Sequence, residues 1–341
     1  MESIKSVHVA TGLITIPPNG WGAVERLTWE YKIALEKLGH GVDIRYMNEL
    51  EKWPNTIVHT HLANQALDCR DKGIPYVYSL HDHHTEWYGK DSWVFKQNLE
   101  AMKSSIISFT HAEYLVDYFD AVDKLFYLPH GANTDFFTPN VQIGRPHALF
   151  MLANNGLGGD SGYDRKGFRW GIEAAEMLNL PITIAGHPDN QKFFDIHSEL
   201  LDYKKLTLKL TNPTDEETRE LYQSHTIFLH PSMLEAGHPN LTLMEATACG
   251  IPIVGTYRGS KPIPGMHVLD KITTEAVIDG IVDVIHNYEE RRKAILNKRT
   301  DYSWDEVGKI LAKYYHNILK INEGYTSEKT RQLYINAYDN L

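Results

Sequence analysis

Cysteine is scarce in this sequence, since only Cys69 and Cys249 occur among 341 residues. Two cysteines are too few for a disulfide framework, which indicates a reducing compartment. Long apolar runs are missing too, because no stretch approaches the ~18 apolar residues of a membrane-spanning helix. The first residues also lack the charged and then apolar pattern of a signal peptide. We therefore expect a cytoplasmic protein with no membrane span.

Basic charge is also in deficit. The chain has 34 Lys and Arg against 44 Asp and Glu, for a net charge of −10. This balance excludes a general positive field, so nucleic acid is not the expected partner. The absence of a basic amphipathic helix disfavours a lipid partner. What remains is an ordinary globular composition, 42% hydrophobic, over a length suited to two domains of roughly 150 residues each.

The order of local patterns predicts an α/β protein with two sheets. Short β-rich runs alternate with helical stretches, which is typical of parallel βα units. The alternation stops at 139–146 and restarts at residue 148, so we place one domain at 1–142, a second at 143–318 and a helical tail at 319–341. The tail's pattern is compatible with packing back on the first domain. The expected strands are 7–10, 42–46, 56–59, 76–80, 106–109 and 125–128 in the first domain, and 148–153, 182–186, 206–210, 226–229 and 251–255 in the second.

Glycines follow the first expected strand and open a helix. Because ligands of open α/β sheets bind at the carboxyl ends of strands, this turn is a candidate site. Gly20, Gly22 and Ala23 offer backbone N–H groups at a helix N-terminus, which favours a phosphate. No Gly-Lys-Ser/Thr follows, so the turn is not a Walker motif.

Histidines follow two other strands, as His59-Thr60-His61 and as the run 81–84. Imidazoles at strand ends can bind a metal, transfer a proton or hydrogen-bond a substrate. We single out His81, because it comes directly at the end of an apolar strand.

Cations lie at the start of a helix in the second domain. Arg165 and Lys166 precede an amphipathic helix that begins near Phe168. The helix dipole disfavours cations there, so the pattern indicates an anion between them, such as a diphosphate.

Segment 230–256 carries the most specific pattern. A strand leads into a Gly/Pro loop with Glu235, and the helix that follows carries Glu245. Carboxylates are good acceptors for sugar and ribose hydroxyls, whereas a catalytic acid and base would need a shared site and perturbed pKa values.

This segment resembles the donor-binding signature of glycosyltransferase family 4, a group of retaining, metal-independent GT-B enzymes. Segments 20–26, 128–139, 166–167 and 302–307 also resemble parts of that family, in the same order. The resemblance implies two Rossmann-like domains facing each other across a cleft. The first domain would bind an acceptor and the second a nucleotide-sugar donor. Closure about a linker near residue 142 would assemble the site.

The resemblance also implies roles for single residues. Glu245 would hold the ribose, Glu235 or its neighbouring backbone the donor sugar, and Lys166 the diphosphate, while His81 would contact the sugar. Catalysis would rest on His81, Lys166 and Glu235, with no metal. The implied donor, a UDP- or GDP-sugar, would contact Gly20, Gly22, Ala23, Arg165, Lys166, Gly237, His238, Asn240, Leu241, Thr242 and Glu245.

Two features depart from the family pattern. Nine residues separate Glu235 from Glu245, where the family usually has seven, so the position of Glu235 differs. Asn154 and Asn155 stand where the family normally has Gly-Arg, which removes one diphosphate cation. Arg165 is the candidate substitute.

The implied reaction transfers a sugar to an acceptor hydroxyl with retention. Fixed cations and backbone donors would stabilise the departing diphosphate. A small saccharide or metabolite is the expected acceptor. The run 81–83 also resembles phage α-glucosyltransferases that act on hydroxymethylated DNA bases, which keeps modified DNA open. Two further alternatives are a metal-dependent hydrolase that uses the strand-end histidines and a non-catalytic sugar-nucleotide binder.

Overall fold

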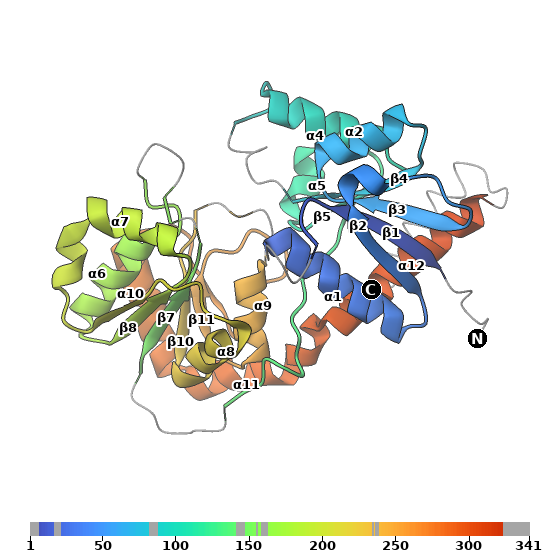
Figure 1. Ribbon diagram of the computed structural model, residues 1–341. Coiled ribbons are helices and arrows are strands. Elements are labelled where there is room, and N and C mark those ends of the chain that lie inside the picture. The colour runs from blue at the N-terminus through green and yellow to red at the C-terminus, as the bar shows by residue number, and fades with distance from the viewer. Residues whose placement is uncertain are drawn as a thin grey trace. The chain divides into compact units, whose positions relative to one another are not determined.

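The chain folds into two α/β units, seen here in a computed structural model that describes residues 7–16, 22–81, 88–140, 147–154, 156–157, 163–233, 235 and 239–322. Of these described residues, those up to 131 and those from 304 onward form unit 1, and those between 132 and 303 form unit 2. Figure 1 shows that each unit is a sheet with helices on both faces. No helix in the described part of the chain combines the length and the apolar character that crossing a bilayer requires.

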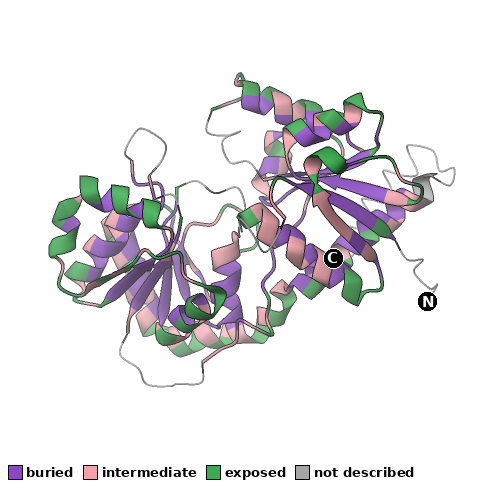
Figure 2. Ribbon diagram, viewed as in Figure 1, coloured by how far each residue is buried: buried purple, intermediate pink, exposed green. Residues whose placement is uncertain are grey.

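Unit 1 is built on a six-stranded parallel sheet in the order β2-β1-β3-β4-β5-β6. Its strands β4 and β5 are buried along their whole length, as expected for a parallel sheet covered on both faces (Figure 2). Helices α1 and α12 cover one face, and α2 and α4 the other (Figure 1). The strands are β1 His8–Leu13, β2 Gly41–Tyr46, β3 Thr56–Thr60, β4 Tyr76–Leu80, β5 Ser108–Thr110 and β6 Leu125–Tyr127, and the helices are α1 Ala23–Lys37, η1 Met47–Glu49, α2 Ala63–Asp71, α4 Trp93–Ser104, α5 Tyr114–Tyr118 and α12 Trp304–Asn322.

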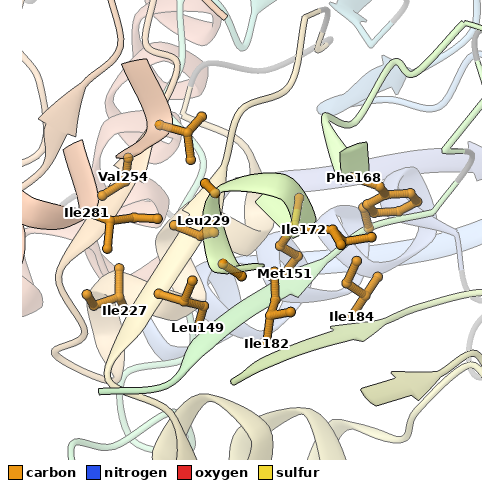
Figure 3. Packing of buried hydrophobic residues seen from close by; sticks show 14 of the residues in the cluster. Leu149, Met151, Phe168, Ile172, Ile182, Ile184, Ile227, Leu229, Val254 and Ile281 are labelled. Carbon is orange, nitrogen blue, oxygen red and sulfur yellow. The ribbon is translucent and has the colours of Figure 1, made fainter. Parts of the chain in front are cut away.

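Unit 2 repeats this plan with a sheet in the order β12-β11-β10-β7-β8-β9. One face packs against α6 and α10, and Figure 3 shows Leu149, Ile182 and Ile227 of the strands beside Ile172 and Ile281 of those helices. The strands are β7 Leu149–Leu152, β8 Ile182–Ala185, β9 Leu206–Lys209, β10 Ile227–His230, β11 Ile253–Gly255 and β12 His267–Val268. The helices are α6 Phe168–Met177, η3 Pro188–Asn190, α7 Gln191–Ile196, η4 Ser198–Asp202, α8 Asp215–Ser224, α9 Leu241–Ala248, α10 Thr274–His286, α11 Tyr288–Lys298 and η5 Arg299–Tyr302.

The C-terminal helix α12 belongs to unit 1, although the sequence analysis assigned residues as far as 318 to the second domain. Trp304 packs edge-on against Tyr31 of α1, with ring centroids 5.8 Å apart. Tyr315 reaches across to His59 of β3, where its hydroxyl lies 2.6 Å from Nδ1. These partners are more than 250 residues apart in the chain, which is why the local pattern does not reveal the contact.

Gly308 lets α12 approach α1 closely, and its replacement tests the packing. A Cβ at position 308 would lie 2.6 Å from Cβ of Ala34. Alanine is better than glycine in a helix by about 1 kcal/mol, so a net loss of stability in Gly308→Ala would report the clash. We expect this loss in denaturant unfolding.

Adding Ala34→Gly should return part of the stability, so the two effects should not be additive. Strict additivity would contradict the close approach. Lys309→Ala, an exposed change on the same helix, serves as the control.

Candidate functional site

The N-terminus of α6 is satisfied by a side chain of the protein itself. The Asp164 carboxylate accepts backbone hydrogen bonds from Gly167 at 2.8 Å, Phe168 at 3.0 Å and Arg169 at 2.7 Å. Burial raises the pKa of Asp164, and these three N–H groups oppose that rise. The sequence analysis inferred an anion beside Arg165 and Lys166, and Asp164 is an anion at that helix end.

Lys166 and Glu235 form a buried ion pair in unit 2. Their exposed fractions are 7% and 8%. Ser232 adds a hydrogen bond from its hydroxyl to Oε1 of Glu235 at 2.6 Å. The pair joins the loop before α6 to the loop after β10, so two strand ends of one sheet are tied together. The structure thus brings together two of the three residues predicted to be catalytic.

Charge within the pair holds both groups ionised. Burial alone would raise the pKa of Glu235, but Lys166, together with His230 and Arg165, outweighs burial and lowers that pKa. Burial lowers the pKa of Lys166, and the Glu235 carboxylate opposes that shift. Removing either partner would therefore leave the other buried without its nearest counter-charge.

Gly167 is required for this arrangement. Its φ of +76° lies in the left-handed region, and an added Cβ would lie 2.4 Å from the carbonyl oxygen of Pro231. Only glycine lets the residue after Lys166 approach the β10 loop so closely.

Helix α9 begins at a well-ordered cap. The Asn240 side chain accepts hydrogen bonds from the backbone N–H of Leu243 at 3.1 Å and from the Thr242 hydroxyl at 3.0 Å. Its amide nitrogen donates to Nε2 of His230 at 3.0 Å. Leu241 and Thr242 form the first helical turn, where backbone N–H groups have no acceptor within the helix. The predicted contacts Gly237 and His238 lie outside the described residues.

Glu245 lies on α9 and is buried, with 8% exposed. The Tyr222 hydroxyl contacts Oε2 of Glu245 at 3.1 Å and the carbonyl of Thr242 at 3.0 Å. The Tyr222 ring packs edge-on against Phe150, with centroids 5.1 Å apart. A core aromatic side chain therefore orients the carboxylate that the sequence predicts to hold a ribose.

Asn190, which the sequence analysis did not identify, shapes the loop after β7. Its side chain donates to the carbonyl of Ala153 at 2.6 Å and accepts from the N–H of Gly156 at 2.9 Å. Asn154, where the resembled family has glycine, accepts a hydrogen bond from the N–H of His187 at 2.8 Å. Asn155 lies outside the described residues. The local sequence carries no signal for Asn190, because its partners lie more than 30 residues away.

In unit 1, the predicted glycine turn is described only in part. Gly22 is the N-cap of α1 with extended backbone, and as a glycine it has no side chain to cap the helix. Ala23 is the first helical residue, and Gly20 lies outside the described residues. The first-turn N–H groups of α1 thus lack a side-chain acceptor at the cap.

Five histidines form a stack at the carboxyl ends of four neighbouring strands of unit 1. Successive ring centroids are separated by 4.5, 5.2, 4.6 and 4.5 Å. In order, the stacked residues are His59, His61, His81, His111 and His130. The sequence analysis identified the first three as strand-end candidates and missed the last two. The available signal was that His111 directly follows β5 and that His130 comes shortly after β6.

Hydrogen bonds occupy the ring nitrogens of His59 and His61. His59 contacts the hydroxyls of Tyr315 at 2.6 Å and Ser79 at 2.8 Å. His61 contacts His81 at 2.9 Å and Thr28 at 3.3 Å. Within the described ranges, no group of three or more His, Cys, Asp or Glu side chains is arranged to hold a metal.

Burial keeps four rings of the stack uncharged. It lowers the pKa of His59 to about 3 and lowers the pKa values of His61, His81 and His111 well below 6.5, with neighbouring imidazoles adding to the shift. These four rings are therefore neutral hydrogen-bonding groups at physiological pH.

Part of the chain matches a known family model. Residues 163–301, within unit 2, match the model described as Glycosyl transferases group 1. None of the curated proteins matches the sequence.

Solved structures resemble the whole fold. HepE from Anabaena, in complex with UDP and glucose, has a TM-score of 0.66 at 11% identity over 90% of this chain and 99% of that one. The catalytic domain of starch synthase IV from Arabidopsis thaliana, bound to ADP and acarbose, has a TM-score of 0.66 at 11% identity over 91% and 98%. An E. coli structure described as trehalose-6-phosphate, bound with UDP-2-fluoro glucose, has a TM-score of 0.67 at 10% identity over 91% and 99%.

These findings confirm the predicted fold class: two parallel-sheet Rossmann-like units, with GT-B glycosyltransferases as structural neighbours. The match to the glycosyltransferase family model supports a transferase enzyme. At such low identities, however, the likeness to the solved structures is one of fold alone.

The buried ion pair gives a first test of the site. Lys166→Met should lower the free energy of unfolding by about 3–5 kcal/mol, because the buried Glu235 carboxylate loses its nearest counter-charge. The double variant Lys166→Met/Glu235→Gln should recover most of that loss. Lys192→Met, which removes a lysine that is 70% exposed, is the matched control. Equal effects of Lys166→Met and Lys192→Met on denaturant unfolding would contradict the pairing.

The histidine stack predicts acid-sensitive stability. The unfolded chain takes up protons as the pH falls below 6.5, whereas folded His59 stays neutral down to about pH 3. Stability should therefore fall on acidification through this window. His59→Gln should reduce the slope by about 1.4 kcal/mol per pH unit, as one titrating group is removed. Unfolding free energies measured between pH 7 and pH 5 give this slope, and an unchanged slope would refute neutral burial of His59.

Proposed function

We propose that the protein is a glycosyltransferase that takes its sugar from a UDP- or GDP-linked donor. The observation that carries the proposal is the buried Lys166–Glu235 pair at the strand ends of unit 2, within residues that match group 1 glycosyltransferases. HepE and the E. coli structure contain UDP or a UDP-sugar, and starch synthase IV contains ADP. Those ligands belong to the neighbours and motivate the donor class proposed here.

Lys166 is the proposed partner of the donor diphosphate. An ammonium has three N–H donors, and Glu235 needs only one or two of them. A fixed cation in a buried environment stabilises the charge that develops on the leaving diphosphate without reorganising at the moment of reaction. Arg165, with 9% exposed, and the first-turn N–H groups of Leu241 and Thr242 are proposed to complete this electrostatic site.

Glu235 and Glu245 are given different roles. Glu245, oriented by Tyr222, is proposed to accept hydrogen bonds from the ribose. Glu235 is bonded to Lys166 and Ser232. We therefore propose that its first task is to orient Lys166, and this fits its unusual spacing from Glu245. A direct contact with the donor sugar remains the alternative role for Glu235.

The finer features follow the resemblance to family 4. Transfer is proposed to retain the anomeric configuration, with the acceptor attacking from the side that the diphosphate leaves and the diphosphate accepting the proton. No metal is assigned a role. A small saccharide or metabolite is the proposed acceptor, and hydroxymethylated DNA is the alternative for an acceptor screen. Cytoplasmic location stays a prediction.

Donor binding tests the proposal directly. A UDP- or GDP-sugar should raise the melting temperature of the protein, because a ligand that binds only the folded state stabilises it. The bound sugar nucleotide should also be hydrolysed slowly in the absence of an acceptor, which would exclude a non-catalytic binder. If neither UDP- nor GDP-sugars bind, the proposed donor class is wrong.

Two variants distinguish the binding of the donor's diphosphate from the binding of its ribose. Lys166→Met/Glu235→Gln should lower the affinity for UDP at least about tenfold, because a charge-assisted hydrogen bond to phosphate is lost. The affinity for uridine should be nearly unchanged. Glu245→Gln should lower the affinity for both UDP and uridine, because both contain the ribose. Lys192→Met is again the control, and calorimetric titration is the measurement. Equal losses for UDP and uridine in the double variant would argue against a diphosphate at Lys166.

A further inference from the structure

A chain of hydrogen bonds links Thr28 of α1 through His61 to His81, and each bond in it has only one possible donor. The Thr28 hydroxyl donates to the carbonyl of Val24 at 2.8 Å, which uses its one hydrogen. The Thr28 oxygen can therefore only accept from Nε2 of His61, 3.3 Å away. His61 is neutral, so its Nδ1 has a lone pair and no proton.

The protonation of His61 determines which nitrogen of His81 carries the proton. Nδ1 of His61 lies 2.9 Å from Nε2 of His81. Because the His61 nitrogen can only accept, His81 must donate from Nε2. A neutral His81 then has an unprotonated Nδ1, and no described residue contacts that atom within hydrogen-bond distance. His81 is partly exposed, so a ligand can reach it.

We propose that Thr28 and His61 are positioning residues that hold His81 in the tautomer protonated on Nε2, so that Nδ1 accepts a hydrogen bond from a ligand hydroxyl. The tautomer follows from the protein's own hydrogen bonds. That the ligand is a sugar rests on the proposed function. His81 thus selects at this point for a group that donates a hydrogen bond, and it disfavours carbonyl, ether or fluorine atoms, which only accept.

A second lone pair beside His81 independently points to a ligand. His111 donates from Nδ1 to the carbonyl of Leu128 at 2.8 Å, so its Nε2 is unprotonated. That Nε2 is buried, with the residue 1% exposed, and has no hydrogen-bond partner among the described residues. The His81 and His111 rings stack at 4.6 Å. A buried acceptor without a partner is costly, and a ligand rich in hydroxyl groups would relieve that cost.

Nuclear magnetic resonance tests the tautomer without any ligand. Long-range proton–nitrogen correlation spectra distinguish protonated from unprotonated imidazole nitrogens. The neutral protein should show Nε2–H for His61 and His81, and Nδ1–H for His111. Detection of His81 protonated on Nδ1 would overturn the proposal, whatever the protein's activity.

Matched variants test the positioning roles. His61→Asn places an acceptor oxygen near the position of Nδ1 and should preserve the tautomer of His81. His61→Leu removes the acceptor, so His81 should then populate both neutral tautomers. Thr28→Ser keeps the acceptor for His61, and Thr28→Val removes it. The spectrum of His81 should change in the Leu and Val variants only. Where one of these fails to fold, the wild-type spectrum alone decides the tautomer. An unchanged His81 spectrum in a folded His61→Leu variant would overturn the positioning role.

Ligand binding tests the hydroxyl contact, with UDP and UDP-glucose as probes. UDP-glucose should shift the His81 Nδ1 resonance, and UDP should not. His61→Leu should lower the affinity for UDP-glucose about fivefold relative to the affinity for UDP, as expected for the loss of one hydrogen bond. Equal affinities of the wild type and the Leu variant for UDP-glucose would overturn the hydroxyl contact. If neither probe binds although the tautomer is as proposed, the proposed function fails and the positioning of His81 stands.

Discussion

The ion pair between Lys166 and Glu235 is the interaction on which the organisation of unit 2 depends. Two charges with only 7% and 8% of their surfaces exposed persist because each compensates the other. Their contact requires the left-handed Gly167, whose absent side chain leaves room for Pro231. The pair therefore determines how the loop before α6 meets the loop after β10. A buried cation held in this way is already oriented before any anionic ligand arrives, which is the arrangement that electrostatic catalysis needs.

In unit 1, too, polar side chains gather at the carboxyl ends of the strands, but there they are neutral. Parallel strands end at one edge of a sheet, so residues that follow β3, β4, β5 and β6 are neighbours. In this unit those residues are histidines, and burial keeps His61, His81 and His111 uncharged. Unit 2 thus offers charge at its strand ends, and unit 1 offers directed lone pairs.

The sequence predicts the fold well because its signals are local. Buried parallel strands such as β7 and β10 read as short apolar runs, the strand-end rule points directly to His81, and the cations at a helix start point to Lys166. It does not predict the contacts between distant segments. Glu235 is 69 residues from Lys166, and Tyr315 is 256 residues from His59, so neither partner is visible in a local pattern. Asp164 is different, because an aspartate just before a helix is a readable capping signal.

The central claim is that the diphosphate of a sugar nucleotide binds at Lys166. A crystal structure of the protein with bound UDP measures this most directly. The account predicts a phosphate oxygen within hydrogen-bond distance of Nζ of Lys166, with the ribose hydroxyls at Glu245. UDP bound elsewhere, with Lys166 in contact only with Glu235, would contradict it.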